Sequence, residues 1–265
     1  MPTDIKLIIR KAVEDLIRDS TTSSKLAESF EKHTEKIHFI PVKYRVLGGI
    51  LQSLNIKFGN FIETLLDEIV DSDTKVEAHP LSGRRIRLQY TSETDAIIDQ
   101  YITYRQLQES SDEFDEEFSN LLREIKRLEN NEDLEKIAIT KDIDALFYSS
   151  EKHPVYVEVK YNDDHDTGKF VDINRKFLKT YAGILNLLPE EERDHLVPYI
   201  YYFNPLKRWG PIYTPSSNIK RGPQLFEDFF EIRFEDVDEC LRGIGDDLDI
   251  INIFDRVYEK VRHKL

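Results

Sequence analysis

The sequence from residue 141 onward reads Lys141-Asp-Ile-Asp-Ala-Leu-Phe-Tyr148, then a polar segment over residues 149–154, then Val155-Tyr-Val-Glu-Val-Lys-Tyr161. Both runs are short and rich in β-branched and aromatic residues, and the segment between them contains Ser, Lys, His and Pro. Such a pattern predicts two neighbouring antiparallel strands joined by a turn.

Charged side chains fall at alternating positions within these two strands. Because successive side chains point to opposite faces of a strand, Glu158 and Lys160 share one face, and Asp142 and Asp144 share a face of their own strand. If the strands pair, two carboxylates and an ammonium group meet at one end of a sheet. Carboxylates held that close raise each other's pKa unless a cation lies between them. Hard oxygen ligands with room for water suit Mg²⁺, and a lysine beside the metal can orient the water that the metal activates.

Other interpretations of the same residues remain open. An Asp, thirteen residues and then Glu-x-Lys form a loose pattern that also arises by chance, and a solvated hairpin with an ordinary cross-strand ion pair would show it. Paired carboxylates also occur in glycosidases. A general-acid role for Glu158 is unfavourable, however, because Lys160 on the same face would keep that carboxyl group ionised.

The composition indicates a folded globular protein, with 40% hydrophobic residues in a chain of 265. The single cysteine, Cys240, excludes an intramolecular disulfide and a zinc site made of thiolates, and it fits a reducing compartment. No apolar run has the length of a membrane span, and the N-terminus lacks a signal-peptide pattern. We therefore expect a cytoplasmic protein.

The formal net charge of −14 argues at first against a nucleic-acid partner, but the distribution of charge matters more than its sum. Residues 36–62 and 195–226 contain no Asp or Glu. The basic residues in the first window are Lys36, Lys43, Arg45 and Lys57, and those in the second are Lys207, Arg208, Lys220 and Arg221. These windows predict basic grooves that could bind DNA; alternatively, they are loops and core elements that are poor in charge.

Hydrophobic periodicity predicts the other elements of the chain. We expect helices at residues 4–18, 25–33, 44–71 (as two helices or one kinked helix), 91–107, 118–128, 172–188, 235–242 and 246–263, strands at 84–90, 197–203 and 229–234, and loops at 110–117 and 204–222. No linker clearly divides the chain. We therefore predict one domain over residues 1–265, with an N-terminal helical region (about 1–45) and C-terminal helices (about 235–265).

Two further regions carry candidate contacts. Arg84, Arg85 and Arg87 lie in a turn and an alternating strand, where they could reach phosphates or base edges, or simply form a solvated strand face. Glu63 lies in a predicted helix one turn after Gly59, and it could contact a metal through water or pair with a lysine at the surface. The oxygen-rich loop at 162–168 is not an EF-hand, because no register places a Glu at its twelfth position.

The order of helices and strands resembles the core of the PD-(D/E)xK nucleases. This resemblance implies an α/β (α+β) fold in which a central mixed β-sheet is flanked by helices and the site opens at one sheet edge. Two longer strings resemble the HinfI-type Type II restriction endonucleases, which are related to the TdeIII group. They are Ser53-Leu-Asn-Ile-Lys-Phe-Gly-Asn-Phe-Ile-Glu63 and Lys160-Tyr-Asn-Asp-Asp-His-Asp-Thr-Gly-Lys-Phe-Val-Asp-Ile-Asn-Arg-Lys176.

The resemblance implies roles for individual residues. Asp144 and Glu158 would be metal ligands together with the Val159 carbonyl, and Lys160 would act on the attacking water. Glu63 matches the acidic position of the family's first core helix. The Pro that opens the motif is absent, which leaves Asp142 as a rival to Asp144. We favour Asp144 because it lies within the apolar strand.

The activity implied by the resemblance is Mg²⁺-dependent hydrolysis of both strands of double-stranded DNA at a short interrupted palindrome, with GANTC as the first candidate. It also implies 5′-phosphate ends, a homodimer, and a cognate DNA methyltransferase as a functional companion. Candidate DNA contacts are Arg84, Arg85, Arg87, Lys169, Asn174, Arg175, Lys207, Arg208, Lys220 and Arg221. The alternatives are a structure-selective or repair nuclease, such as a junction resolvase, and a non-catalytic DNA-binding or scaffold protein.

Overall fold

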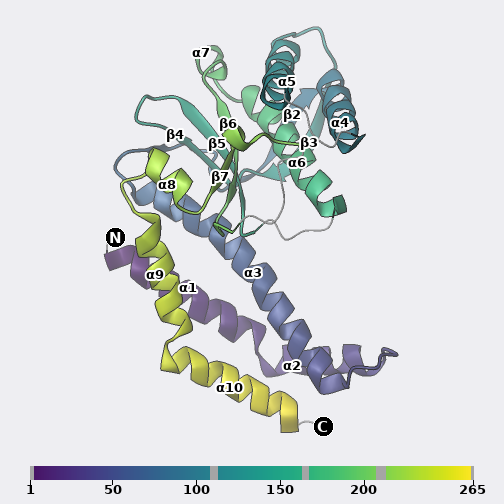
Figure 1. Cartoon of the computed structure of the whole chain (residues 1–265), viewed down its shortest axis with the longest axis vertical. Helices are drawn as coiled ribbons and strands as arrows, with labels where there is room; N and C mark the ends of the chain where they lie inside the picture. The colour runs from purple at the N-terminus through teal and green to yellow at the C-terminus, as the bar shows by residue number, and fades with distance from the viewer. Residues whose placement is uncertain (1–2, 108–112, 163–166, 207–212, 264–265) are drawn as a thin grey trace. The chain divides into compact units, whose positions relative to one another are not determined.

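The structure is a computed structural model that describes residues 3–107, 113–162, 167–206 and 213–263 (Figure 1). The chain forms two compact units: a helical unit, Met1–Leu65 with Ile232–Leu265, and a sheet unit, Leu66–Glu231. The terminal helical regions expected from the sequence thus belong to one unit. The single domain that we predicted over residues 1–265 stays a prediction.

Amphipathic helices make up the helical unit, as their apolar periodicity predicted. They are α1 (Thr3–Ser20), α2 (Ser23–Thr34), the greater part of α3 (Val42–Ser72), α9 (Phe234–Gly245) and α10 (Leu248–His263). The helix α3 runs through Gly48 and Gly49 without interruption. Glycine costs a helix only about 1 kcal/mol, and the buried side chains of Val46, Ile50 and Leu54 offset that cost. None of the described helices is both long and apolar enough to cross a membrane.

A five-stranded mixed sheet is the centre of the sheet unit, which confirms the expected fold class. Its strands, in spatial order, are β1 (Glu77–Ala78), β4 (Ala145–Tyr148), β5 (Pro154–Lys160), β6 (Val197–Tyr202) and β7 (Ile219–Arg221). The strands β1, β4 and β5 pair antiparallel, whereas β5, β6 and β7 pair parallel. Ala145 lies opposite Val157 and Tyr148 opposite Pro154, so the predicted hairpin is confirmed.

The run that we expected to be one strand, Lys141–Tyr148, divides between two ladders. Its first residues belong to β3 (Lys136–Asp142), which pairs antiparallel with β2 (Arg85–Thr91) in a separate two-stranded sheet. Ile143 and Asp144 belong to neither strand, and the chain enters β4 directly after them. This break places Asp144 at the junction between the two sheets.

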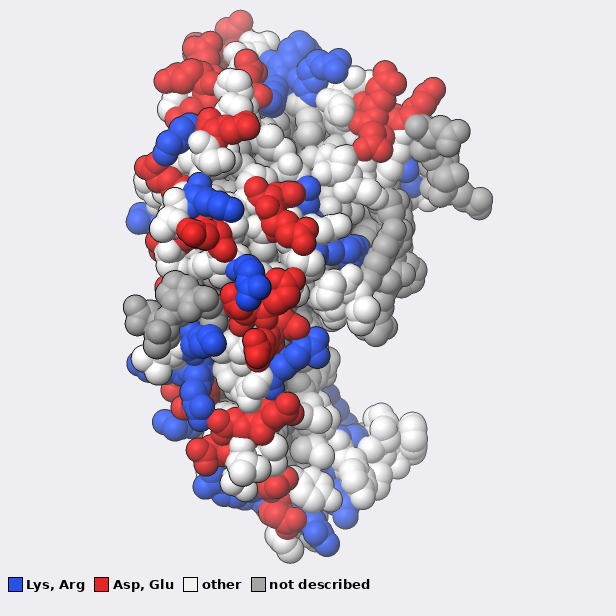
Figure 2. All heavy atoms as spheres, turned by 60° about the vertical axis from the view of Figure 1, so that its left-hand side comes forward, with Lys and Arg blue, Asp and Glu red and all other residues white. Residues whose placement is uncertain are grey.

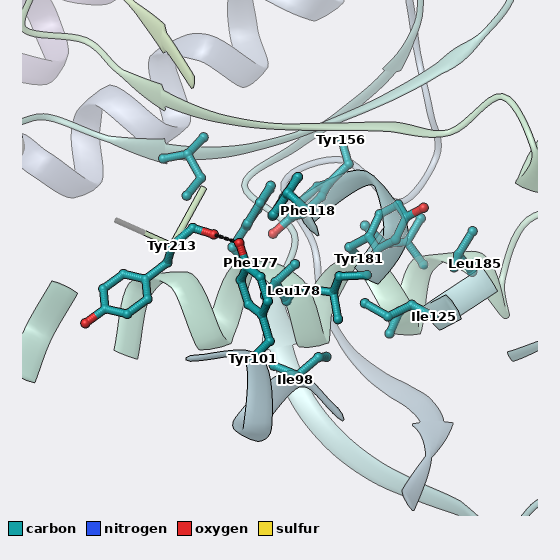
Figure 3. Close-up of a cluster of buried hydrophobic side chains, with 14 of the residues drawn as sticks. Ile98, Tyr101, Phe118, Ile125, Tyr156, Phe177, Leu178, Tyr181, Leu185 and Tyr213 are labelled. Atoms are coloured by element: carbon teal, nitrogen blue, oxygen red, sulfur yellow. Dashed lines mark hydrogen bonds between the residues drawn. The ribbon is translucent and has the colours of Figure 1, made fainter. Parts of the chain in front are cut away.

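Helices cover both faces of the central sheet (Figure 1). On one face lie α4 (Ser92–Leu107), α5 (Phe114–Glu129) and α6 (Thr167–Leu185), and α8 (Pro223–Phe229) packs on the other; the short helices α7 (Glu190–Arg193) and η1 (Ser216–Asn218) flank β6. In the core shown in Figure 3, the Tyr156 ring from β5 stacks on Phe177 of α6 with centroids 5.8 Å apart. The Phe147 ring of β4 instead packs against the Phe229 ring of α8, with the ring centroids 5.5 Å apart.

Three expected elements differ in the structure. The predicted strand at 229–234 does not form: Phe229 ends α8, Phe234 begins α9, and the short connection between them pairs with no strand, although Phe230, Ile232 and Phe234 are buried at alternate positions as in a strand. The helix α5 begins at Phe114, inside a predicted loop, because the buried Phe114 extends its apolar face. The strand β7 lies in the other predicted loop and pairs with β6.

Candidate active site

Asp144, Glu158 and Lys160 meet at one end of the central sheet, as the strand pattern predicted. Glu158 and Lys160 lie on β5, and Asp144 lies one step beyond the Ala145–Val157 pair, opposite Glu158. The side chains of Asp144 and Glu158 are 1% and 0% exposed, whereas that of Lys160 is 16% exposed. The two carboxylates are therefore buried beneath a lysine that water can reach.

The Lys160 ammonium group contacts all three oxygen donors that the motif assigns to a metal ion. Its Nζ lies 2.8 Å from Glu158 Oε1 and 3.2 Å from Asp144 Oδ2, and it also donates to the Val159 carbonyl oxygen. These donors thus converge on one point that a cation already fills. Within the described residues, no group of three or more acidic, His or Cys side chains could hold a metal. Two carboxylates and a carbonyl leave positions for water, as Mg²⁺ prefers, so this donor set fits a divalent ion.

A second lysine, Lys176 of α6, reaches the same carboxylates. Its Nζ lies 3.1 Å from Asp144 Oδ1 and 2.8 Å from Glu158 Oε1. Our sequence analysis gave Lys176 no role. The signal that could have revealed it is its position between Ile173 and Phe177, at the edge of the apolar stripe that faces the sheet.

The opposite charges keep these groups ionised despite their burial. Burial raises the pKa of Glu158, but the ammonium groups of Lys160 and Lys176 outweigh it and hold that pKa below its usual value. Burial likewise lowers the pKa of Lys176, yet Glu158 and Asp144 outweigh it and raise that pKa above its usual value. At neutral pH, Glu158 is therefore an anion and Lys176 a cation.

Neighbouring polar groups fix the orientation of both carboxylates. The Val159 N–H donates to Asp144 Oδ2 at 2.9 Å, and the Tyr156 hydroxyl donates to Glu158 Oε2 at 2.9 Å. Burial, together with the negative charges of Glu158 and Asp144, raises the pKa of Tyr156 well above its usual value. Tyr156 therefore stays protonated and keeps donating. It is a further contact of the site that our sequence analysis did not name.

A turn before β2 supports the start of β4 beside Asp144. The Leu146 N–H donates to Ser82 Oγ at 3.0 Å, and Ser82 Oγ donates to Asp67 Oδ1 at 2.6 Å. Gly83 follows with φ +64, and a Cβ atom there would lie 2.3 Å from Asp67 Oδ2. The turn therefore requires a glycine for both its backbone conformation and its close approach to Asp67.

Asp142, the rival to Asp144, points elsewhere. It ends β3, its side chain is 55% exposed, and it pairs at 3.3 Å with Arg85, whose side chain is 69% exposed. The geometry thus favours Asp144 as the acidic residue beside Glu158.

Comparison with known proteins gives the family. A family model described as Type II restriction endonuclease, HinfI, matches residues 1–245. The chain belongs to the HinfI family of Type II restriction endonucleases. It is also 42% identical to the Type II restriction enzyme HinfI of Haemophilus influenzae over 265 residues, covering 98% of each chain. No solved structure matches it.

Membership of the HinfI family makes this chain an endonuclease that hydrolyses DNA at specific sites. Type II restriction endonucleases generally need a divalent metal ion, in agreement with the fit of the donor set. DNA is accordingly the substrate. A side chain that contacts DNA must be accessible at the surface, so the exposure of each candidate decides whether it can make that contact. Acidic side chains lie among basic ones over much of the face of this HinfI-family enzyme that is drawn in Figure 2.

Several candidate DNA contacts are at the surface of the sheet unit. Arg84, Arg85, Arg87 and Lys169 are exposed, the first three around the start of β2 and the last near the start of α6. Arg175 is partly exposed and donates to Asp99 Oδ1 at 2.7 Å. These five residues remain predictions as DNA contacts.

Asn174 does not suit the DNA contact that we expected. It is 1% exposed, its amide donates to the Phe170 carbonyl oxygen at 2.9 Å, and its Oδ1 accepts from Thr214 at 2.8 Å. A buried amide with both ends bonded to protein is a structural group. It ties α6 to the segment that precedes β7.

The remaining candidates divide into paired and undescribed residues. Lys220 pairs with Asp228 at 2.6 Å, and the Arg221 guanidinium lies 4.5 Å from the centroid of the Tyr202 ring. Lys207 and Arg208 lie outside the described residues. Glu63 lies on α3 within the helical unit, and its part in the site stays a prediction.

Proposed function

We propose that this endonuclease is Mg²⁺-dependent and that Asp144, Glu158 and Lys160 are its catalytic residues. It cuts both strands of double-stranded DNA within a short interrupted palindrome, with GANTC as the first candidate, and leaves 5′-phosphate and 3′-hydroxyl ends. The observation that carries the proposal is the convergence of two buried carboxylates and the Val159 carbonyl on one cationic centre.

The reaction is hydrolysis of a phosphodiester by in-line attack of water, in which the P–O bond to the 3′ oxygen breaks. A divalent ion held by Asp144, Glu158 and the Val159 carbonyl would stabilise charge on the phosphate and lower the pKa of bound water. The protein's own contribution is positioning and electrostatic stabilisation. The Val159 N–H and the Tyr156 hydroxyl hold the two carboxylates in fixed orientations.

Lys160 is suited to act on the water. Its side chain is the one of the three that solvent reaches, and its ammonium group can donate three hydrogen bonds. Once a metal ion takes the place of this ammonium group at the three donor oxygens, the N–H groups of Lys160 would be available to hold an attacking water or a phosphate oxygen. Glu63, which matches the acidic position of the family's first core helix, is a further candidate catalytic residue.

Cleavage of both strands implies two copies of the site. The described part of the chain holds one such cluster, and a two-fold symmetric recognition sequence is matched by a two-fold symmetric protein. We therefore propose a homodimer that acts in the cytoplasm. A methyltransferase that modifies the same sequence would protect the host DNA as a functional companion without forming part of the enzyme.

The test is digestion of plasmid DNA with Mg²⁺, followed by sequencing of the fragment ends. We expect discrete fragments that all end within one interrupted palindrome, with 5′-phosphates on both strands. Omission of Mg²⁺ in the presence of a chelator should abolish cutting. Random ends, or cleavage restricted to branched DNA, would overturn the proposal in favour of a non-specific or structure-selective nuclease.

A further inference from the structure

Lys176 lies where a residue could control how tightly the site holds its metal ion. We propose that Lys176 is a built-in counter-ion that competes with the divalent ion for Asp144 and Glu158, and so keeps metal affinity low until DNA phosphates enter the site. This inference rests on the proposed function, since it concerns the same carboxylates.

The charge balance of the cluster is the first step. Asp144 and Glu158 carry two negative charges, and Lys160 and Lys176 carry two positive charges, each ammonium group within 3.2 Å of both carboxylates. These four side chains sum to zero formal charge by themselves. A divalent ion added to them would leave a surplus of two positive charges in a site where burial weakens screening by solvent.

The two lysines differ in how they meet the ligands. Lys160 contacts all three proposed donors, so its ammonium group occupies the place that the metal would take and must leave it. Lys176 instead contacts the other oxygen of Asp144, Oδ1, while sharing Glu158 Oε1. It can therefore remain beside the carboxylates while Lys160 withdraws, and it would then repel the incoming ion.

The backbone of α6 keeps Lys176 within reach. The next residue, Phe177, is 0% exposed and stacks on Tyr156 of β5, and Thr180, one turn further on, is also 0% exposed. The helix is thus held against the face of the sheet that carries Glu158. The side chain of Lys176 is the part that can move, and it is 24% exposed, so a path to water is open to it.

DNA supplies the missing negative charge. Each phosphate brings about one negative charge to the site, which offsets the surplus that the metal creates and makes binding of the ion more favourable. Because binding linkage is reciprocal, the metal then raises DNA affinity by the same factor. Lys176 would thus make metal binding depend on DNA, and a variant without this charge should lose part of that dependence.

The experiment measures binding of Ca²⁺ and of Mg²⁺ to the full-length protein by calorimetry, first without DNA. Lys176→Met removes the charge at similar length, and Lys176→Arg keeps it. Lys179→Met is the matched control, since Lys179 lies on the same helix but pairs with Asp95 at 2.6 Å. We expect Lys176→Met to bind either ion about tenfold tighter or more, and the other two variants to stay within about twofold of wild type.

A second titration with saturating non-cleavable duplex completes the test. The wild type should gain more metal affinity from DNA than Lys176→Met does. Equal or weaker metal binding by Lys176→Met in the absence of DNA would overturn the inference. If Lys176 only supported the structure, its loss would leave Asp144 and Glu158 less well positioned and would not raise metal affinity. If Lys176→Met does not fold, Lys176→Gln, which retains hydrogen bonding without charge, takes its place under the same criterion.

These outcomes separate the inference from the proposed function. A wild-type protein that binds neither ion, with or without DNA, would contradict the proposed function itself. A wild-type protein that binds metal and cuts DNA, while the neutral variants bind metal no tighter, would contradict the role of Lys176 alone.

Discussion

Replacement of Asp144 by Asn should abolish DNA cleavage, whereas the same replacement at Asp142 should leave it intact. Both residues occur in the run that the motif covers, two positions apart. Each replacement exchanges a carboxylate for an amide of the same shape. Their environments differ sharply, because the side chain of Asp144 is 1% exposed and contacts two ammonium groups, while that of Asp142 is 55% exposed and pairs with the exposed Arg85. The pair thus forms a matched test of the site.

The magnitudes follow from those contacts. Metal ions contribute several kcal/mol of transition-state stabilisation, which corresponds to a loss of about a thousandfold or more in rate if Asp144→Asn prevents the ion from binding. Removing one partner of a buried ion network costs up to about 3–5 kcal/mol, and water access to Lys160 and Lys176 reduces that cost. An exposed pair such as Asp142–Arg85 contributes about 0–1 kcal/mol.

The assay is single-turnover cleavage of a labelled duplex with saturating enzyme and Mg²⁺, so that weaker DNA binding does not obscure the chemical step. Urea unfolding of each variant gives its stability, and circular dichroism shows that it is folded. Asp142→Asn should cleave within about twofold of wild type, as expected for a surface substitution. Cleavage by folded Asp144→Asn within tenfold of wild type, or an equal loss in Asp142→Asn, would refute the assignment.

Three further predictions concern the turn before β2 and DNA binding. Gly83→Ala should lower the free energy of unfolding by about 1–2 kcal/mol because of the left-handed backbone at this residue alone, and the close approach to Asp67 should add to this loss. Urea unfolding measures the change. Gly59→Ala is the control, because a Cβ atom there meets no described atom within 4 Å, and it should not destabilise the protein. Alanine at Arg84 or Arg87 should relax sequence preference if the residue reads a base, but weaken binding to all sequences equally if it contacts a phosphate, as competition between duplexes would show. DNA affinity should fall steeply between low and high salt, and a flat response would contradict phosphate contacts by exposed basic residues.

The hairpin that carries the site could be predicted because its signal is local. Alternation of Val with Tyr, Glu and Lys in β5 fixes which side chains share a face, and the pairing with β4 then brings Asp144 opposite Glu158. The amphipathic helices could be predicted for the same reason, since each carries its apolar stripe within a few turns. Both kinds of element depend on residues that are close in sequence.

Strand partners and strand ends could not be read in this way. The run from Lys141 to Tyr148 is continuous in composition, yet it divides where β3 leaves its pairing with β2 and β4 begins pairing with β5. Phe230, Ile232 and Phe234 show the alternating burial of a strand, but they lie in the short connection after α8 and at the start of α9, where no strand pairs with them. A ladder needs a second chain segment, and its availability is a property of the whole fold rather than of the segment itself.

Polar residues on α6 show the same limit for function. Asn174 was expected to contact DNA and Lys176 was given no role, but the first is bonded within the protein and the second reaches a carboxylate 32 residues earlier in the chain. Periodicity identifies the apolar stripe of a helix, and it does not tell which polar neighbours of that stripe find buried partners. Those partners are set by the strand that the helix covers.

The cross-strand ion pair and the metal site, which the sequence left as alternatives, involve the same residues. A Glu that is 0% exposed stays ionised only beside cations, and both Lys160 and Lys176 supply them at 2.8 Å. A divalent ion would meet the same need at the same oxygens. An ion-pair network therefore does not argue against catalysis here, because the buried carboxylates require a cation in either case. Metal binding by the Lys176 variants and cleavage by Asp144→Asn distinguish whether a lysine or a divalent ion neutralises these carboxylates when DNA is present.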